Sequence, residues 1–466
     1  MKAAFLTLGC KVNYYETEQM MKDFEQHGFE VVDFHDRADV YVINTCTVTN
    51  IADRKSRKMI HRAKKRNPDS IVAAVGCYVE SAGRKSGIDG ALPDNALSET
   101  ALSDLVFLNS QKKDVARKVA AYLQQHGRMT GAGAHCLEAG GMRENKMSGR
   151  TSGRTRKYIK IQDGCNQFCS YCTIPYVRGG GVLSSRPAED VLEEIRQVAE
   201  RGVREVVITG IHLSSYGADG SEIGLQSASP QSASRFVRLK GEPLVELLER
   251  VNEVDGIERI RLGSLEPRII CEEFMQGLSR VDKLCPHFHL SLQSGCDATL
   301  RRMNRHYTAA QYREGCERIR RYYEHPAITT DVIVGFPGET EEEFEETRRF
   351  VKEVGLADIH VFPYSVRTGT KAAGMDGQVS PDEKHRRSEI LIADAEELKA
   401  LYAQWFVGKI EKVLFEEVRE AGGGRYLVGH NERYMLFGVP VQEAREKGYS
   451  ENQIAQLEIR QEHCFI

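Results

Sequence analysis

The chain has 466 residues, of which 41% are hydrophobic and 28% charged, a composition typical of globular proteins with two or three domains. Its 64 Lys and Arg against 67 Asp and Glu give a net charge of −3, so bulk charge neither favours nor excludes a polyanionic partner. No apolar run approaches the roughly 18 residues that cross a bilayer, which excludes a membrane-spanning protein. A chain of this length does not need disulfides to stabilise its fold. We therefore expect its 12 cysteines to bind a metal or a cluster in the reducing cytoplasm.

The first hundred residues alternate β-rich and helical patterns. Strands are predicted at 3–8, 40–44 and 71–75, and amphipathic helices at 14–26 and 51–65. This order predicts a parallel sheet, in an α/β N-terminal domain that we place at residues 1–115.

Each of these three strands runs into a cysteine, namely Cys10, Cys46 and Cys77. Because the carboxyl ends of neighbouring parallel strands converge, the three thiols can meet at one site. The alternative is three buried cysteines that act as small hydrophobic side chains.

The middle of the chain predicts a second domain at residues 151–390, after a linker at 116–150 that becomes rich in Gly, Ser and Arg. Six β-rich runs with helices between them are too few for a closed eight-stranded barrel and predict an open (βα)6 barrel. These runs lie at 158–162, 205–209, 259–263, 288–293, 329–334 and 359–364. Residues 220–238 are predicted to be a surface insertion, because Gln, Ser and Ala repeat there.

The last domain is placed at residues 395–466. It begins within a charged helix predicted at about 382–404, and short alternating strands are predicted after it at 409–417 and 426–429. We predict a small all-β, barrel-like module.

The strongest local motif is a C-x3-C-x2-C run, Cys165, Cys169 and Cys172, directly after the first strand of the predicted barrel. A structural zinc site requires a fourth ligand and usually has two C-x2-C pairs. A [4Fe–4S] cluster held by three cysteines leaves one iron open for a substrate. We favour the cluster over a zinc site or unliganded thiols.

This motif at the head of a partial barrel resembles the radical S-adenosylmethionine (SAM) superfamily. The resemblance implies that the open iron binds SAM, and that one electron splits its sulfonium to give a 5′-deoxyadenosyl radical. Polar residues at the carboxyl ends of barrel strands are the candidate SAM contacts, each with a turn or a helix cap as the alternative. These candidates are Thr209, Gly210, Ser264, Glu266, Ser291, Gln293 and Asp331.

Together with Cys10, Cys46 and Cys77, the motif resembles the radical SAM methylthiotransferase family over nearly the whole chain. The supporting segments are 7–13 (TLGCKVN), 44–46 (NTC), 76–77 (GC), 165–179, 289–295 (HLSLQSG), 331–338 (DVIVGFPG) and 360–370. The resemblance implies a second [4Fe–4S] cluster on these three cysteines and two SAM molecules per turnover. It also implies an external low-potential electron donor of the flavodoxin or ferredoxin type.

The segments 9–13 (GCKVN) and 362–370 (FPYSVRTGT) are most similar to the branch that acts on N6-threonylcarbamoyladenosine beside the anticodon of tRNA. The implied reaction adds a methylthio group at C2 of that base. Branches that modify isopentenyladenosine in tRNA or a ribosomal-protein aspartate remain alternatives. A zinc-stabilised RNA-binding protein without catalysis is the alternative from another class.

Two basic segments and the last module are the candidate RNA contacts. The first basic segment is the predicted helix at 51–65 together with residue 66, and it carries eight cations. They could bind RNA phosphates, and the alternative is that they form an ordinary solvated face. They are Arg54, Lys55, Arg57, Lys58, Arg62, Lys64, Lys65 and Arg66. The second segment contains Arg150, Arg154, Arg156 and Lys157. The last module resembles the TRAM domain, an RNA-binding β-barrel, with Trp405, Tyr426 and Tyr434 as candidate stacking residues.

Overall fold

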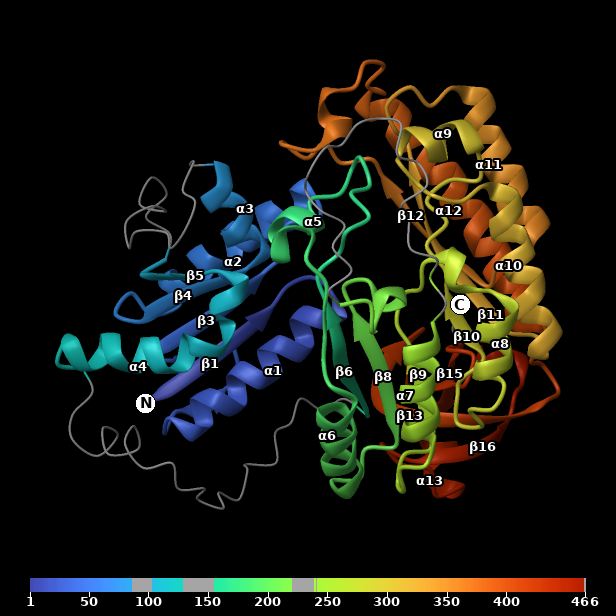
Figure 1. Ribbon diagram of the computed structural model, residues 1–466. Coiled ribbons are helices and arrows are strands. Elements are labelled where there is room, and N and C mark those ends of the chain that lie inside the picture. The colour runs from blue at the N-terminus through green and yellow to red at the C-terminus, as the bar shows by residue number, and fades with distance from the viewer. Residues whose placement is uncertain (86–102, 129–154, 220–238, 240, 465–466) are drawn as a thin grey trace.

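The computed structural model describes residues 1–85, 103–128, 155–219, 239 and 241–464. The predicted insertion at 220–238 and the basic residues Arg150 and Arg154 lie outside these residues. No helix in the described ranges is long and apolar enough to cross a membrane. The chain is an α/β protein with a parallel N-terminal sheet, a partial barrel and an antiparallel C-terminal sheet, as predicted (Figure 1).

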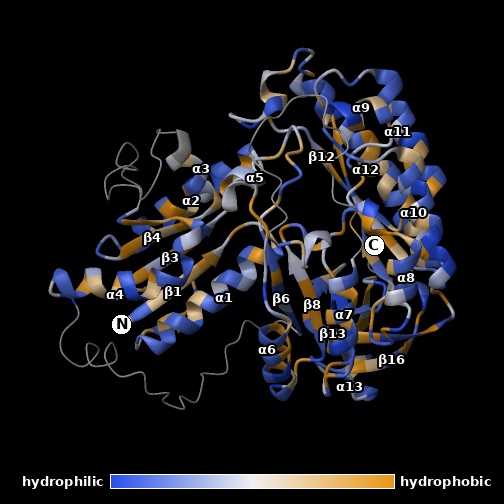
Figure 2. Ribbon diagram, in the orientation of Figure 1, coloured by the Kyte–Doolittle hydropathy of each residue, from blue (hydrophilic) through white to orange (hydrophobic). Residues whose placement is uncertain are grey.

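The N-terminal domain is built on five parallel strands in the order β2-β1-β3-β4-β5. They are β1 (Lys2–Thr7), β2 (Glu30–Val32), β3 (Val40–Thr45), β4 (Ile71–Gly76) and β5 (Leu105–Phe107). The central strands β3 and β4 are buried throughout and almost continuously hydrophobic, as in parallel sheets covered on both faces (Figure 2). The three predicted strands are confirmed.

Helices cover both faces of this sheet. They are α1 (Lys11–Gln26) and α4 (Val115–Gln125) on one face, and α2 (Asn50–Arg66) and α3 (Cys77–Lys85) on the other. Helix α4 falls within the segment expected to be a linker, yet its Val119 and Leu123 pack in one core with Phe5 and Met20. The hydrophobic core of the N-terminal sheet therefore extends to α4.

The six predicted barrel strands are present and lie parallel in chain order. They are β6 (Arg156–Asp163), β8 (Glu205–Gly210), β9 (Arg259–Leu262), β10 (His287–His289), β11 (Ala327–Val334) and β12 (Asp358–Pro363). Single bridges from Ile260 to Leu284 and from Leu265 to Leu290 join the two halves of the sheet. Among the described strands β6 pairs with β8 and with the short β7 (Ser184–Ser185) but not with β12, so the barrel is open between β6 and β12.

Helices pack on the outside of the barrel, where α10, α11 and α12 line one side of the molecule (Figure 1). The barrel helices are α5 (Ile174–Val177), α6 (Ala188–Glu200), α7 (Glu242–Asn252), α8 (Glu272–Leu278), α9 (Asp297–Arg302), α10 (Ala309–Tyr322), α11 (Glu341–Val354) and α12 (Pro381–Gln404). The apolar faces of α6, α7, α8, α10, α11 and α12 form one continuous core with the strands.

The C-terminal module is an antiparallel sheet in the order β15-β14-β13-β16. The short helix α13 (Val441–Glu446) lies between β15 and β16 in the chain. Its strands are β13 (Ile410–Ala421), β14 (Gly424–Asn431), β15 (Leu436–Pro440) and β16 (Ile454–Glu458). Barrel arginines dock it: Arg259 Nη2 donates to the Lys412 carbonyl at 2.7 Å, and Arg156 Nη2 to Glu416 Oε1 at 2.6 Å.

Two aromatic residues that are candidate RNA contacts also pack against side chains of the protein. Trp405 stacks on His325 with ring centres 4.0 Å apart, and the Lys409 ammonium lies 2.8 Å from the centre of its indole. Tyr434 has the guanidinium groups of Arg156 and Arg261 at 5.0 and 4.8 Å from its ring centre. These residues therefore fix the module to the barrel, because cation–π contacts of this kind are stabilising.

The N-terminal domain contacts the β6 edge of the barrel through a buried ion cluster centred on Glu16. Its carboxylate accepts from Lys112 at 2.5 Å, from Arg178 at 2.6 Å and from Lys160 at 2.7 Å. Burial opposes ionisation of Glu16, but these three cations hold its pKa well below the usual range. The stability that this ionised carboxylate contributes is therefore present above about pH 4.3 and is lost as the pH falls further.

A second contact joins the N-terminal domain to the segment that follows β12. Arg367 Nη2 donates to Thr47 Oγ1 at 2.6 Å and pairs with Asp53 at 2.9 Å, and the Asn50 backbone N–H donates to Ser365 at 3.1 Å. The N-terminal domain thus contacts both edges of the open barrel.

We expect Glu16→Gln to lower the free energy of unfolding by about 3–5 kcal/mol, because the substitution leaves buried cations without a counter-ion. Urea unfolding followed by circular dichroism measures this change. Glu193→Gln is the control, since Glu193 is 60% exposed and lies 3.6 Å from Arg196, and it should change stability by less than about 0.5 kcal/mol. Equal stability of the two variants would contradict a role for the ion cluster.

Candidate active site

The C-x3-C-x2-C cysteines lie on the loop between β6 and α5, where Cys169 is buried and the other two are partly exposed. The three sulfurs are close enough to interact electrostatically with one another. Backbone N–H groups donate to two of them, from Gln167 to Cys165 and from Ile174 to Cys172 at 3.4 Å. Arg305 Nη1 lies 3.2 Å from the Cys169 sulfur. Such donors lower the cost of ionising these sulfurs when a metal cluster binds.

Burial raises the pKa of Cys165 to about 12 and that of Cys172 further, against the hydrogen bonds that these sulfurs accept. Both thiols are therefore protonated at neutral pH without a metal. Binding of iron releases these protons, because the ligand is the thiolate.

The arrangement of the donors fits a cluster better than a single metal ion. Throughout the described ranges, no three His, Cys, Asp or Glu side chains are arranged to hold one ion. A four-iron cluster spaces its thiolates more widely than a zinc ion does. Three mutually interacting cysteines with N–H donors on one loop therefore fit a cluster held by three thiolates.

The N-terminal cysteines follow three neighbouring strands, as predicted. Cys10 follows β1, Cys46 follows β3 and Cys77 begins α3 directly after β4. The sulfurs of all three interact electrostatically with one another, and burial raises the pKa of Cys46 to about 11. The structure thus brings these three residues together at the carboxyl edge of the sheet.

Two glycines make this convergence possible. Gly9 and Gly76 precede Cys10 and Cys77 and have φ values of +102° and +106°, which L side chains rarely adopt. A Cβ on Gly9 would lie 2.9 Å from the Cys46 sulfur, and one on Gly76 would lie 2.7 Å from the Thr45 carbonyl. Only glycine therefore fits beside the neighbouring strand at either position.

The seven candidate SAM contacts lie on the expected elements. Thr209 and Gly210 end β8, while Ser264 and Glu266 follow β9; Ser291 and Gln293 follow β10, and Asp331 lies within β11. Gln293 has φ +69° and its backbone N–H donates to the Asp331 carbonyl at 2.8 Å, which brings these two together. Asp331 also pairs with His289 at 3.3 Å.

Two of the seven are connected to the C-x3-C-x2-C loop. Glu266 accepts from Arg268 at 2.8 Å, and Arg268 in turn donates to Gln167 of the loop at 2.9 Å. Arg305 contacts both the Cys169 sulfur and, at 3.3 Å, the Ser291 carbonyl. In the described residues no hydrogen bond joins Thr209 or Ser264 to the loop, and Ser264 is exposed.

Two arginines near the cysteines were missed as site residues by the sequence analysis. Arg178, six residues after Cys172, donates to Asn13 at 2.7 Å and to Glu16, and its charge acts on Cys10 and Cys77. Arg305 is 136 residues from Cys169, so no local pattern indicates their contact. The position of Arg178 directly behind the cysteine motif is the one signal that the sequence offered.

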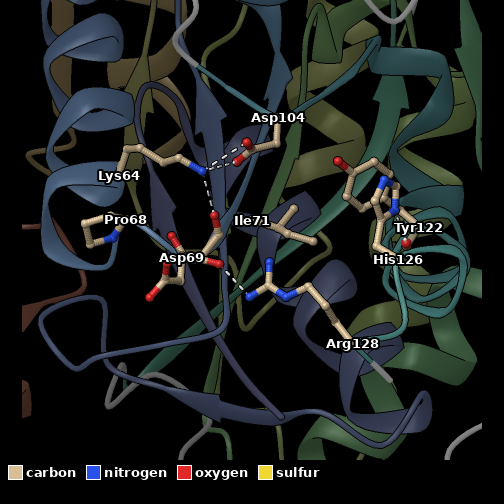
Figure 3. Close-up of a pocket in the computed structure, with 9 residues that line it drawn as sticks. Lys64, Pro68, Asp69, Ile71, Asp104, Tyr122, His126 and Arg128 are labelled. Atoms are coloured by element: carbon tan, nitrogen blue, oxygen red, sulfur yellow. Dashed lines mark hydrogen bonds and ion pairs between the residues drawn. The ribbon is translucent and has the colours of Figure 1, made fainter. Parts of the chain in front are cut away.

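A pocket in the N-terminal domain lies away from Cys10, Cys46 and Cys77. Figure 3 shows Lys64, Asp104 and Arg128 around it, near the start of β4, whereas these three cysteines lie at the opposite edge of the sheet. Its charged groups are paired with the protein: Lys64 contacts Asp104 at 2.9 Å, and Arg128 donates to the Asp69 carbonyl at 2.5 Å. This pocket is therefore separate from the cysteine site of the N-terminal domain.

The partial barrel and its cysteine loop define the class of protein. Residues 159–351 match the model of the radical SAM superfamily, and residues 2–90 match the uncharacterized protein family UPF0004. The radical SAM methyltransferase TsrM of Kitasatospora setae shares the fold, with a TM-score of 0.54 and 14% identity over 80% of this chain and 74% of that chain. The chain is therefore a radical SAM protein, a class that uses a [4Fe–4S] cluster and SAM.

Proteins of similar sequence show which family within the radical SAM class this chain belongs to. Threonylcarbamoyladenosine tRNA methylthiotransferase MtaB of Bacillus subtilis (strain 168) is 38% identical over 433 residues, which cover 93% of this chain and 89% of that protein. MtaB of Thermotoga maritima is 32% identical over 92% of this chain and 89% of that protein. The tRNA-2-methylthio-N(6)-dimethylallyladenosine synthase of Syntrophotalea carbinolica is 33% identical over 91% of each chain. The chain belongs to the radical SAM methylthiotransferase family.

Proposed function

We propose that this protein methylthiolates tRNA at C2 of N6-threonylcarbamoyladenosine next to the anticodon. The observation that carries the proposal is the pairing of two cysteine triads, one on the barrel and one on the N-terminal sheet, with Arg178 acting on the second. The Bacillus relative, which is named for this nucleoside, is 38% identical, whereas the dimethylallyladenosine synthase is 33% identical.

In this proposal the two triads have different tasks. Cys165, Cys169 and Cys172 hold the cluster that binds SAM, and Cys10, Cys46 and Cys77 hold a second [4Fe–4S] cluster that carries the inserted sulfur. When bound, the first cluster and SAM supply the one-electron chemistry that removes hydrogen from an unactivated carbon. The backbone donors to the loop and Arg305 would stabilise the sulfurs as thiolates once the cluster is bound.

Two SAM molecules are consumed per turnover in this reaction, one for the methyl group and one for the radical. An external low-potential donor of the flavodoxin or ferredoxin type supplies the electron. Among the predicted SAM contacts, Ser291 is joined to the cysteine loop through Arg305, which binds its carbonyl. Glu266 caps the short 3-10 helix Pro267–Ile269, where its carboxylate accepts from the Arg268 backbone N–H at 3.2 Å, so its side chain fits the helix-cap alternative.

Exposed apolar side chains border the site and support binding of unstacked bases. Val48 and Ile51 follow Cys46 and are 50% and 65% exposed, while Tyr176 and Val182 follow the barrel cysteines at 40% and 66%. Across the opening, Phe362 at the end of β12 is 44% exposed. Apolar and aromatic surfaces of this kind bind the bases of an anticodon loop.

Helix α2 supplies the basic surface for tRNA in this proposal. Five of its cations are exposed, and in the described part of the chain none of the five forms an ion pair. They are Arg54, Lys55, Lys58, Arg62 and Lys65. Because α2 begins four residues after Cys46, phosphates bound here lie close to the N-terminal triad.

We also propose a division into three domains that moves the first boundary beyond α4, to about residue 125, with the barrel at 155–390 and a TRAM-like RNA-binding module at 395–466. The module would contact RNA through the exposed turn of the β13–β14 hairpin, where Arg425 is exposed, rather than through Trp405.

Iron analysis and product analysis test the two cluster sites. We expect anaerobically purified protein to hold about eight irons, and the Cys10/Cys46/Cys77 triple Ala variant about four. Cys46→Ala should cleave SAM without forming the methylthio nucleoside, and Cys169→Ala should do neither; mass spectrometry of tRNA nucleosides measures both. Cys271→Ala, a partly exposed cysteine outside both triads, is the control. A methylthio product from Cys46→Ala would refute the second site.

The glycines before the N-terminal cysteines allow a subtler test. We expect Gly9→Ala to lose about four irons, because its Cβ would collide with Cys46 at 2.9 Å. Gly28→Ala is matched in backbone strain, with φ +82°, but nothing lies within 4 Å of its Cβ, so its iron content should not change. Retention of eight irons in Gly9→Ala would show that Cys46 is not held as the structure indicates.

The basic surface of α2 is tested by replacing three cations that share one face, Arg54, Lys58 and Arg62, with Ser. We expect weaker tRNA binding. The slope of log Kd against the logarithm of salt concentration should decrease by about 2–3, roughly one for each lost phosphate contact. Fluorescence anisotropy at several salt concentrations measures both. The control replaces Arg196, Arg250 and Arg280, which are 53%, 44% and 62% exposed on the barrel. Equal effects in both variants would show nonspecific attraction only.

A further inference from the structure

Lys11 follows Cys10 at the start of α1, and its side chain is half-buried. Its charge interacts with ionisable groups of five of the six barrel strands. These groups belong to Arg156 on β6, Glu205 on β8, Arg261 on β9, His287 on β10 and Asp331 on β11. Because these strands surround one interior, a side chain near all of them points into it from the open side.

The ammonium group of Lys11 has no counter-ion. In the described residues no hydrogen bond or ion pair joins it to another side chain, whereas its charged neighbours are paired. Arg156 and Arg261 both bind Glu205, at 2.8 and 3.0 Å, and Asp331 pairs with His289 at 3.3 Å. A half-buried cation without a partner is costly, so this position favours an anionic ligand.

The pairing of the neighbouring carboxylates supports this conclusion. Arg156, Arg259 and Arg261 share Glu205, and Arg156 also binds Glu416, so these carboxylates have cationic partners of their own. Burial and the neighbouring cations hold the pKa of His287 well below its usual range. In the described residues none of these carboxylates forms an ion pair with Lys11.

The proposed substrate carries a matching group. The threonylcarbamoyl substituent on N6 ends in a free carboxylate, because the threonine is attached through its nitrogen, while an isopentenyl substituent carries no charge. We propose that Lys11 binds the carboxylate of the threonylcarbamoyl group and thereby selects this nucleoside over N6-alkyl adenosines. This inference rests on the proposed function and adds the residue that sets its specificity.

The charge on the protein and the charge on the ligand are removed in turn to test this contact. The probes are two fluorescent anticodon stem-loops, one with N6-threonylcarbamoyladenosine and one in which the threonine carboxylate is a neutral amide. We expect the unaltered protein to bind the carboxylate form about 10- to 100-fold more tightly, as for one charge-assisted hydrogen bond. Lys11→Met should bind both forms equally, by fluorescence anisotropy, and Lys11→Arg should restore the preference.

Lys113→Met, at an exposed lysine of the same domain, is the control and should keep the preference. Iron content is measured for each variant, because Lys11 adjoins Cys10. If Lys11→Met loses iron as well as the preference, recovery of the preference in Lys11→Arg supports the contact and its absence overturns it. An unchanged preference in Lys11→Met also overturns it. Failure of the unaltered protein to methylthiolate the carboxylate stem-loop would refute the proposed function, which is a different result.

Discussion

The buried carboxylate of Glu16 is the interaction on which the relation between the two cysteine sites depends. It lies six residues after Cys10 on α1 and binds Arg178, which lies six residues after Cys172. Lys112 and Lys160 complete its shell from the N-terminal domain and from β6. A relative movement of the two domains that broke these contacts would leave a buried charge without its partners. Such a movement would cost several kcal/mol of free energy. The separation of the two triads is therefore fixed by electrostatics rather than by an apolar interface alone.

An open barrel leaves its interior accessible between β6 and β12, and the N-terminal domain is attached to both of these edges. The Glu16 cluster holds the β6 side, while Arg367 with Asp53 and Thr47 holds the segment after β12. Lys11, Cys10 and the α2 surface are thereby placed at the opening. The same domain that brings the second triad also supplies the groups that a substrate meets as it enters.

Much of this organisation could be predicted from local sequence patterns. The β-rich runs predicted all six barrel strands and the three N-terminal strands that end in cysteines, because hydrophobic strand patterns are local. The three-residue strands β2 and β5 have too little pattern to be detected. Contacts such as Arg305 with Cys169, Arg367 with Asp53 and Lys11 with the barrel join residues far apart in sequence, so only the folded chain shows them. The contacts of Trp405 and Tyr434 with barrel residues could not be predicted for the same reason.

The amino ends of the barrel strands bind the C-terminal sheet, and their carboxyl ends carry the cysteine loop. At the amino ends of β6 and β9, Arg156, Arg259 and Arg261 share Glu205 and bind the C-terminal sheet, and the pKa of Glu205 is held at about 2 by these arginines despite its burial. At the carboxyl ends lie the cysteine loop and the candidate SAM contacts, as in barrel enzymes generally. The C-terminal module occupies the amino end, so a nucleoside that reaches Lys11 enters past the two triads. This route would carry the adenine of a carboxylate-bearing nucleoside into the space between them.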